Sequence, residues 1–104
     1  MRNQNTLFLT ILLLLTLLPL SGCGYPAVSP KTYEISKALY SVCNQKSTDR
    51  LKTVQTLIDS SLKEKEINER EAGWLNAIVA SANKGNWETA TQEARRLMED
   101  QTGR

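Results

Sequence analysis

Helix start and stop signals divide the chain after residue 28 into four short stretches, and this division constrains the fold more than any other feature. Ser29 before Pro30 is typical of a helix start, because a hydroxyl can accept a hydrogen bond from a free backbone N–H and proline fits the first turn. Ser47 or Thr48 can begin a second helix in the same way. No stretch alternates apolar and polar residues as a strand would, so the pattern predicts an all-α fold.

The later boundaries carry signals of the same kind. Asn68, with Glu71 three residues on, matches a capping box, in which each side chain bonds the backbone N–H of the other residue. Gly85 favours the left-handed backbone that ends a helix, and Asn86 can cap the next one. The charged residues 63–66 fit either further helix or a solvated turn, and both interpretations stay open.

Each stretch carries an apolar face at helical spacing. The faces comprise Ile35, Ala38, Leu39 and Val42; Leu51, Val54, Leu57, Ile58 and Leu62; Trp74, Leu75, Ile78, Val79 and Ala82; and Trp87, Ala90, Ala94, Leu97 and Met98. Because short connections make consecutive helices antiparallel, we expect a small bundle of about four short antiparallel helices over residues 31–104. Trp74 and Trp87 could meet across the last hairpin as core anchors, and ligand stacking is the alternative.

Residues 1–22 have the anatomy of a signal peptide. A polar start carries Arg2, an apolar run follows from Leu7 to Leu18, and small residues close the segment. A transmembrane helix is the rival interpretation. Spanning a bilayer takes about 20 apolar residues, however, and Pro19 interrupts the run before that length is reached.

The residues Leu20, Ser21, Gly22 and Cys23 resemble the lipobox of bacterial lipoproteins, which has an aliphatic residue, two small residues and a cysteine. The resemblance implies that signal peptidase II recognises Leu20, Ser21 and Gly22 and cuts before Cys23. It also implies that the Cys23 thiol carries a diacylglyceryl group, and in such proteins the new amine is often acylated. Because two or more acyl chains hold a protein firmly on a bilayer, the implied protein is anchored to a membrane of the cell envelope. An ordinary signal peptide is the alternative.

Residues 23–30 are expected to form the lipidated cysteine and a short extended linker. Pro26 and Pro30 disfavour helix before them, and the seven residues 24–30 span at most roughly 23 Å. The helical domain should therefore lie close to the bilayer. In the lipoproteins that the lipobox resembles, an Asp after the cysteine favours the inner membrane; Gly24 stands there, so the outer membrane is preferred and the inner stays open.

Charge and residue usage argue against several function classes. The formal net charge is +2, and Arg2 is the one charged residue in the signal segment, so the remainder is close to neutral and does not resemble a nucleic-acid binder. The chain has no histidine, and lipidation of Cys23 would leave Cys43 as the only thiol, so a Cys–His nucleophile is absent. We expect no catalytic residue, metal site or cofactor. Cys43 borders an apolar face and is expected to be buried, with a disulfide between copies as the alternative.

Residues 74–97 resemble a single tetratricopeptide-type helical hairpin. The matching positions are Trp74, Gly85, Asn86, Trp87, Ala90 and Leu97. Ile78 stands where that family has a glycine, Ser81 and Ala94 replace aromatic residues, and stacked arrays need about three repeats. The resemblance therefore implies a helical hairpin and no more.

These features together predict a non-enzymatic, membrane-anchored envelope lipoprotein whose helical domain binds another envelope protein. The prediction depends on the anchor, on the lack of catalytic groups and on a domain small enough that a partner would help to stabilise it. A self-assembling structural component of the envelope is the alternative. The partner, the oligomeric state and the role of Cys43 are left open.

Overall fold

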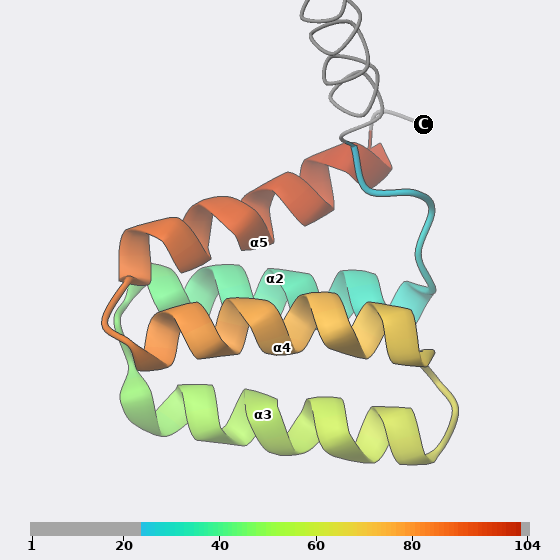
Figure 1. Ribbon diagram of the computed structural model, residues 1–104, viewed down its shortest axis with the longest axis horizontal. Coiled ribbons are helices and arrows are strands. Elements are labelled where there is room, and N and C mark those ends of the chain that lie inside the picture. Colours follow the sequence, from blue (N-terminus) through green and yellow to red (C-terminus); the bar gives the residue numbers. More distant parts are fainter. Residues whose placement is uncertain (1–23, 103–104) are drawn as a thin grey trace, which may run out of the picture.

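The computed structural model describes residues 24–102, and within them the chain forms four α-helices and no strand. The helices are α2 (Pro30–Asn44), α3 (Thr48–Lys63), α4 (Glu69–Asn83) and α5 (Trp87–Thr102). Successive helices run in opposite directions (Figure 1). The predicted small all-α bundle is therefore confirmed. The predicted signal peptide, the recognition residues Leu20, Ser21 and Gly22, and Cys23 lie outside the described residues.

The central pair of the bundle is α2 and α4. Both helices contact α3 and α5 and each other, whereas α3 and α5 have no contact among the described residues. Figure 1 shows the result, with α5 on one side of the central pair and α3 on the other. Within the part that is described, no helix combines the length and apolar character that crossing a membrane requires.

The core fills the space between the central pair and its two neighbours. Its buried apolar side chains are Ile35, Leu39, Val42, Cys43, Leu51, Val54, Ile58, Ile67, Ala72, Leu75, Ile78, Val79, Ala82, Ala90, Ala94 and Leu97. Alanine at Ala90 and Ala94 lets α5 approach α2 and α4 closely, because a methyl group is the whole side chain there. Most of the predicted apolar faces are thus confirmed.

The predicted caps are present at three helix starts. The Ser29 hydroxyl accepts a hydrogen bond from the backbone N–H of Thr32 at 3.2 Å. Ser47 rather than Thr48 caps α3, since its hydroxyl accepts from the backbone N–H of Arg50 at 3.3 Å. A side-chain oxygen at these positions satisfies one of the backbone donors that a helix leaves free at its start. The capping box of Asn68 is the third case and belongs to the site described below.

The connections between helices settle the choice that the sequence left open at residues 63–66. α3 ends at Lys63, and the backbone turns at Lys65, whose φ of +63° lies in the left-handed region. The charged stretch therefore leaves the helix after Lys63, and residues 64–66 form a turn. Gly85 has a φ of +87°, as its predicted role in ending α4 requires, and α5 begins two residues later.

The apolar face of α3 is narrower than its sequence suggests. Leu57 is 38% exposed, whereas Ser61 is 1% exposed. Because each residue advances about 100° around a helix, Ser61 lies closer than Leu57 to the line of Val54 and Ile58 that faces the core. Predicting Leu57 as a core residue was wrong, and the Ser61 hydroxyl is buried with no hydrogen-bond partner among the described residues.

The two tryptophans do not meet, which corrects a second expectation. Trp74 packs edge-on against Tyr25, with 5.1 Å between the ring centroids, whereas Trp87 begins α5 near the C-terminal end of α2. In an antiparallel hairpin the residue opposite Trp87 is near the end of α4, and Trp74 lies nine residues before that end, about 14 Å along the axis. Both rings are half-buried against the core, at different places.

Candidate functional site

Residues 24–29 form an extended segment that is docked on the helical bundle, and we call this segment the strap. In Figure 1 it descends from the C-terminal end of α5 to the start of α2. The Gln101 side chain on α5 bonds the strap twice. Its Oε1 accepts from the backbone N–H of Val28 at 3.1 Å, and its Nε2 donates to the carbonyl oxygen of Pro26 at 2.8 Å. The linker is extended as predicted, but it is not a free tether.

Tyr25 is the side chain that joins the strap to both α4 and α5. Its ring packs on Trp74 at an interplanar angle of 74°, and its hydroxyl donates to Glu93 Oε1 at 2.7 Å. The backbone N–H of Tyr25 donates to Asp100 Oδ2, also at 2.7 Å. Burial, the hydrogen bond to Glu93 and the negative charge of Glu93 together raise the pKa of Tyr25 to about 12. The phenol therefore stays protonated and remains a donor at neutral pH.

Glu71 holds the other end of the strap and is 3% exposed. Its Oε2 accepts from the backbone N–H of Ser29 at 2.7 Å, and its Oε1 accepts from the Ser29 hydroxyl at 3.2 Å and from the backbone N–H of Asn68 at 2.9 Å. The backbone N–H of Glu71 in turn donates to Asn68 Oδ1 at 2.8 Å. The predicted capping box is confirmed, and the same carboxylate also caps the strap.

The environment of Glu71 favours its ionised form. Burial alone would raise the pKa of this carboxyl group, but hydrogen bonds from the backbone N–H groups of Ser29 and Asn68, and from the hydroxyls of Ser29 and Thr32, act in the opposite direction. The effect of the hydrogen bonds exceeds the effect of burial, so the pKa of Glu71 lies below its ordinary value. A buried carboxylate with several donors is thus the fixed point at which the strap, α2 and α4 meet.

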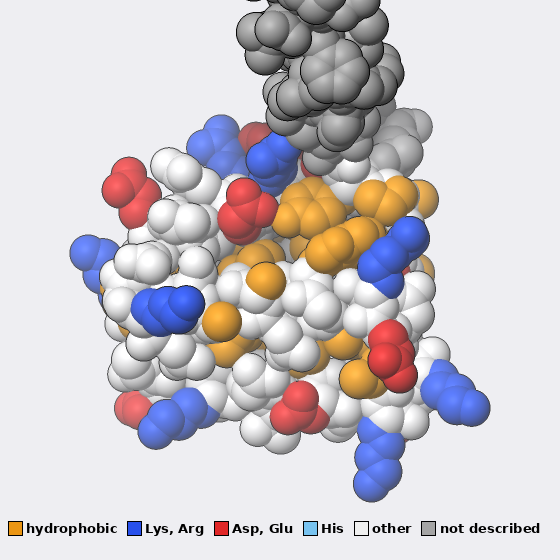
Figure 2. Space-filling model, viewed as in Figure 1, with side chains coloured by type: hydrophobic (Ala, Val, Ile, Leu, Met, Phe, Trp, Pro, Cys, Tyr) orange, Lys and Arg blue, Asp and Glu red, His pale blue; other side chains and the backbone are white. Residues whose placement is uncertain are grey.

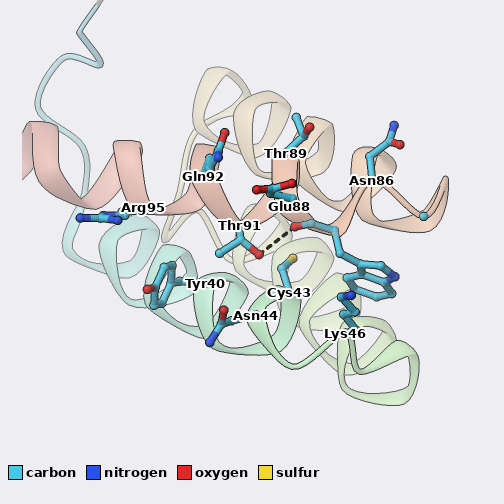
Figure 3. A pocket seen from close by; sticks show the side chains of 12 residues that line it. Tyr40, Cys43, Asn44, Lys46, Asn86, Glu88, Thr89, Thr91, Gln92 and Arg95 are labelled. Carbon is cyan, nitrogen blue, oxygen red and sulfur yellow. Dashed lines mark hydrogen bonds between the residues drawn. The ribbon is translucent and has the colours of Figure 1, made fainter.

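A second feature, an open groove of about 710 Å³, lies between the C-terminal half of α2 and the N-terminal half of α5. We call it the α2–α5 groove. Figure 3 shows Tyr40 and Asn44 on the α2 side, Gln92 and Arg95 on the α5 side, and Cys43 between the two helices. The complete lining is Tyr40, Cys43, Asn44, Lys46, Gly85, Asn86, Trp87, Glu88, Thr89, Thr91, Gln92 and Arg95.

Cys43 forms part of the groove floor but is only 1% exposed. Burial raises the pKa of the Cys43 thiol, so the reactive thiolate is disfavoured. The predicted buried position is confirmed. A disulfide between copies through Cys43 would require this buried thiol to become exposed.

The α2–α5 groove is lined by charged and amide side chains. Lys46 and Arg95 supply positive charge, Glu88 supplies negative charge, and Asn44 and Gln92 supply amide donors and acceptors. The Thr91 hydroxyl donates to the carbonyl oxygen of Trp87 at 2.7 Å. Across residues 24–102 no cluster of three or more His, Cys, Asp or Glu side chains is placed to hold a metal ion.

The outer surface carries mixed charge. On the face drawn in Figure 2, hydrophobic side chains gather where the strap meets α4 and α5, and basic and acidic side chains are scattered over the rest. Ion pairs follow the helix spacing on α5, with Arg95 Nε 2.9 Å from Glu99 Oε2 and Arg96 Nη1 3.8 Å from Glu93 Oε2. Charge alone therefore identifies no single binding face.

Comparisons with known proteins add no relative to this picture: no family model, no curated protein and no solved structure matches the chain. α4 and α5 do form a helical hairpin, but the likeness to a tetratricopeptide-type repeat stays a prediction, as does the lipobox. Reasoning from the sequence identified Glu71 as a cap and missed its hold on Ser29. It also missed the docking residues Tyr25 and Gln101, for which the sequence carries no local signal.

Proposed function

We propose that the protein is a membrane-anchored lipoprotein of the cell envelope, without enzymatic activity, whose helical domain binds another envelope protein. One observation carries the proposal: an apolar run is followed by Leu20, Ser21, Gly22 and Cys23, in that order. Cys23 directly precedes Gly24, the first residue of the strap, so the acyl chains would be attached next to the strap. The outer membrane is the preferred location.

The α2–α5 groove is the surface that we propose for the partner. Residues that contribute most to protein–protein binding are enriched in Trp, Tyr and Arg, and the groove contains one of each in Trp87, Tyr40 and Arg95. Amide side chains surround these three, which fits the polar rim of a typical interface. Self-assembly remains the second possibility for the same surface, and the cross-linking experiment below separates the two.

The anchor can be tested by metabolic labelling with an alkyne analogue of palmitate. The wild-type chain should incorporate the label, and Cys23→Ser should lose it completely. Cys43→Ala is the matched control, because it removes the other thiol of the chain and should leave labelling unchanged. Equal labelling of the wild-type chain and Cys23→Ser would refute the lipoprotein proposal.

The partner surface can be tested by photo-cross-linking in intact cells. A benzoylphenylalanine replaces Gln92, which is exposed in the groove, or Thr53, which is exposed on α3. A product between this chain and a different protein, formed from position 92 and not from position 53, is the expected result. Products at multiples of the chain's own mass would replace the proposed partner by self-assembly. No product from position 92 would remove the groove as a binding surface.

A further inference from the structure

The strap occupies a special place, because it is the segment that would connect the proposed lipid anchor to the domain. A Cβ atom on Gly24 would lie 3.7 Å from the carboxylate of Asp100, so the chain enters the described fold beside the C-terminal end of α5. In Figure 1, α5 lies on the side of the bundle where the strap begins, and α3 lies on the opposite side of the central pair. The start of the strap and α3 are therefore on opposite sides of the domain.

The contacts of the strap show that its docking is specific. Its two ends and its middle are each held by a different side chain of the bundle: Asp100 binds the N–H of Tyr25, Gln101 binds at Pro26 and Val28, and Glu71 binds Ser29. Two of these acceptors are carboxylates, and hydrogen bonds to a charged acceptor are about twice as strong as neutral ones. The Tyr25 ring adds apolar contact with Trp74. A flexible linker would not make these contacts, so the strap has a fixed position on the bundle.

We infer that the strap is a docked spacer, which holds the α5 side of the domain at the membrane surface with α3 outermost, and whose release lets the domain move away from the bilayer. The inference rests on the proposed lipid anchor at Cys23. The six strap residues reach at most about 20 Å when extended. Docked, they add little height, because they lie along the body of the domain.

The test uses the full-length, lipidated chain in phosphatidylcholine vesicles that contain an acceptor-labelled lipid. A donor dye is attached at Thr53→Cys on the exposed face of α3, in a Cys43→Ala background so that one thiol reacts. The release variant is Tyr25→Ala with Gln101→Ala, which removes the ring contact and both Gln101 hydrogen bonds. Tyr40→Ala is the matched control, since Tyr40 is also a half-buried ring packed on the core but lies in the groove.

The release variant should increase the mean distance between the dye and the acceptor plane by on the order of 10 Å, as expected for a short flexible chain of six residues. Tyr40→Ala should leave the distance unchanged. The same distance in the wild-type chain and in the release variant would overturn the inference, provided that helical circular dichroism is intact in both and that the strap amides of the release variant exchange at the free-peptide rate.

Hydrogen exchange on the wild-type chain gives a second test that depends on no variant. The amides of Tyr25, Val28 and Ser29 donate to bundle side chains, so they should exchange several-fold more slowly than in an unstructured peptide. Exchange at the free-peptide rate would contradict docking. Failure of the anchor has a different signature: the chain would not stay with the vesicles, although its strap amides would still be protected.

Discussion

Polar side chains are buried and hydrogen-bonded at one end of the bundle and exposed at the other. At the strap end, where α4 begins and α5 finishes, Glu71 is buried and each of its oxygens accepts hydrogen bonds from the strap or the α4 cap. At the groove end, where α2 finishes and α5 begins, Asn44 and Gln92 extend from the helix surfaces into an open space. The first arrangement fixes structure, and the second offers groups to another molecule.

The physical reason for the contrast is desolvation. A buried polar atom must find its partner inside the protein, because an unsatisfied group costs about 1 to 3 kcal/mol. An exposed side chain bonds water in the free protein and can exchange that water for a partner at small cost. Substitutions at the strap end should therefore alter stability, whereas those at the groove end should alter binding.

Replacing Glu71 should have the largest effect. Glu71→Ala removes the acceptor of the Ser29 and Asn68 N–H groups and leaves a buried void, so we expect it to lower the free energy of unfolding by about 3 kcal/mol. Urea denaturation followed by circular dichroism measures this loss. Glu69→Ala, an exposed residue in the same first turn of α4, should cost less than about 0.5 kcal/mol. Equal losses at the two positions would remove the distinction between the strap end and an ordinary helix start.

Acid should weaken the strap end through the same carboxylate. The pKa of Glu71 is lower in the folded chain than its ordinary value of about 4.3, so its contribution to stability is complete above that value and is lost as the pH falls through the folded pKa. The wild-type chain should therefore lose more stability than Glu71→Gln when the pH is lowered below about 4.3. Urea midpoints of the two chains across this range provide the measurement, and parallel curves would contradict the prediction.

The Tyr25 hydroxyl should make a smaller contribution. Tyr25→Phe keeps the ring on Trp74 and removes only the hydrogen bond to Glu93, which we expect to cost about 1 kcal/mol because the site is half-buried. Tyr40→Phe is the matched change at the groove end and should be close to neutral. Thermal melts of the two variants would show this difference, and a larger loss for Tyr40→Phe would reverse the comparison.

The smallest effect on stability is expected from the groove rim. Gln92 is exposed, so Gln92→Ala should change the free energy of unfolding by less than about 0.5 kcal/mol. The proposed function predicts that the same substitution reduces the yield of a cross-link to the partner from a probe placed at Glu88. A clear loss of stability would show that the rim is part of the structure rather than an open surface.

Local signals account for most of what could be predicted from the sequence. A cap, a left-handed glycine and an apolar face each involve residues within one or two turns, so Ser29, the Asn68–Glu71 pair and Gly85 were read correctly. The errors arose where a prediction required distances across the bundle. Trp74 and Trp87 do not pair because they lie at different positions along the hairpin. Leu57 is exposed because the part of α3 that faces the core is narrower than its apolar stripe.

The sequence by itself determined the four helices, their antiparallel order and the motif at Cys23 from which anchoring is proposed, because these depend on short-range spacing and chain connectivity. Only the tertiary structure decided that the linker is a docked strap. Tyr25 bonds Asp100 from 75 positions away, and Ser29 bonds Glu71 from 42. No local pattern encodes such contacts, since they form only after packing has brought the start of the chain's helical region beside the end of α5.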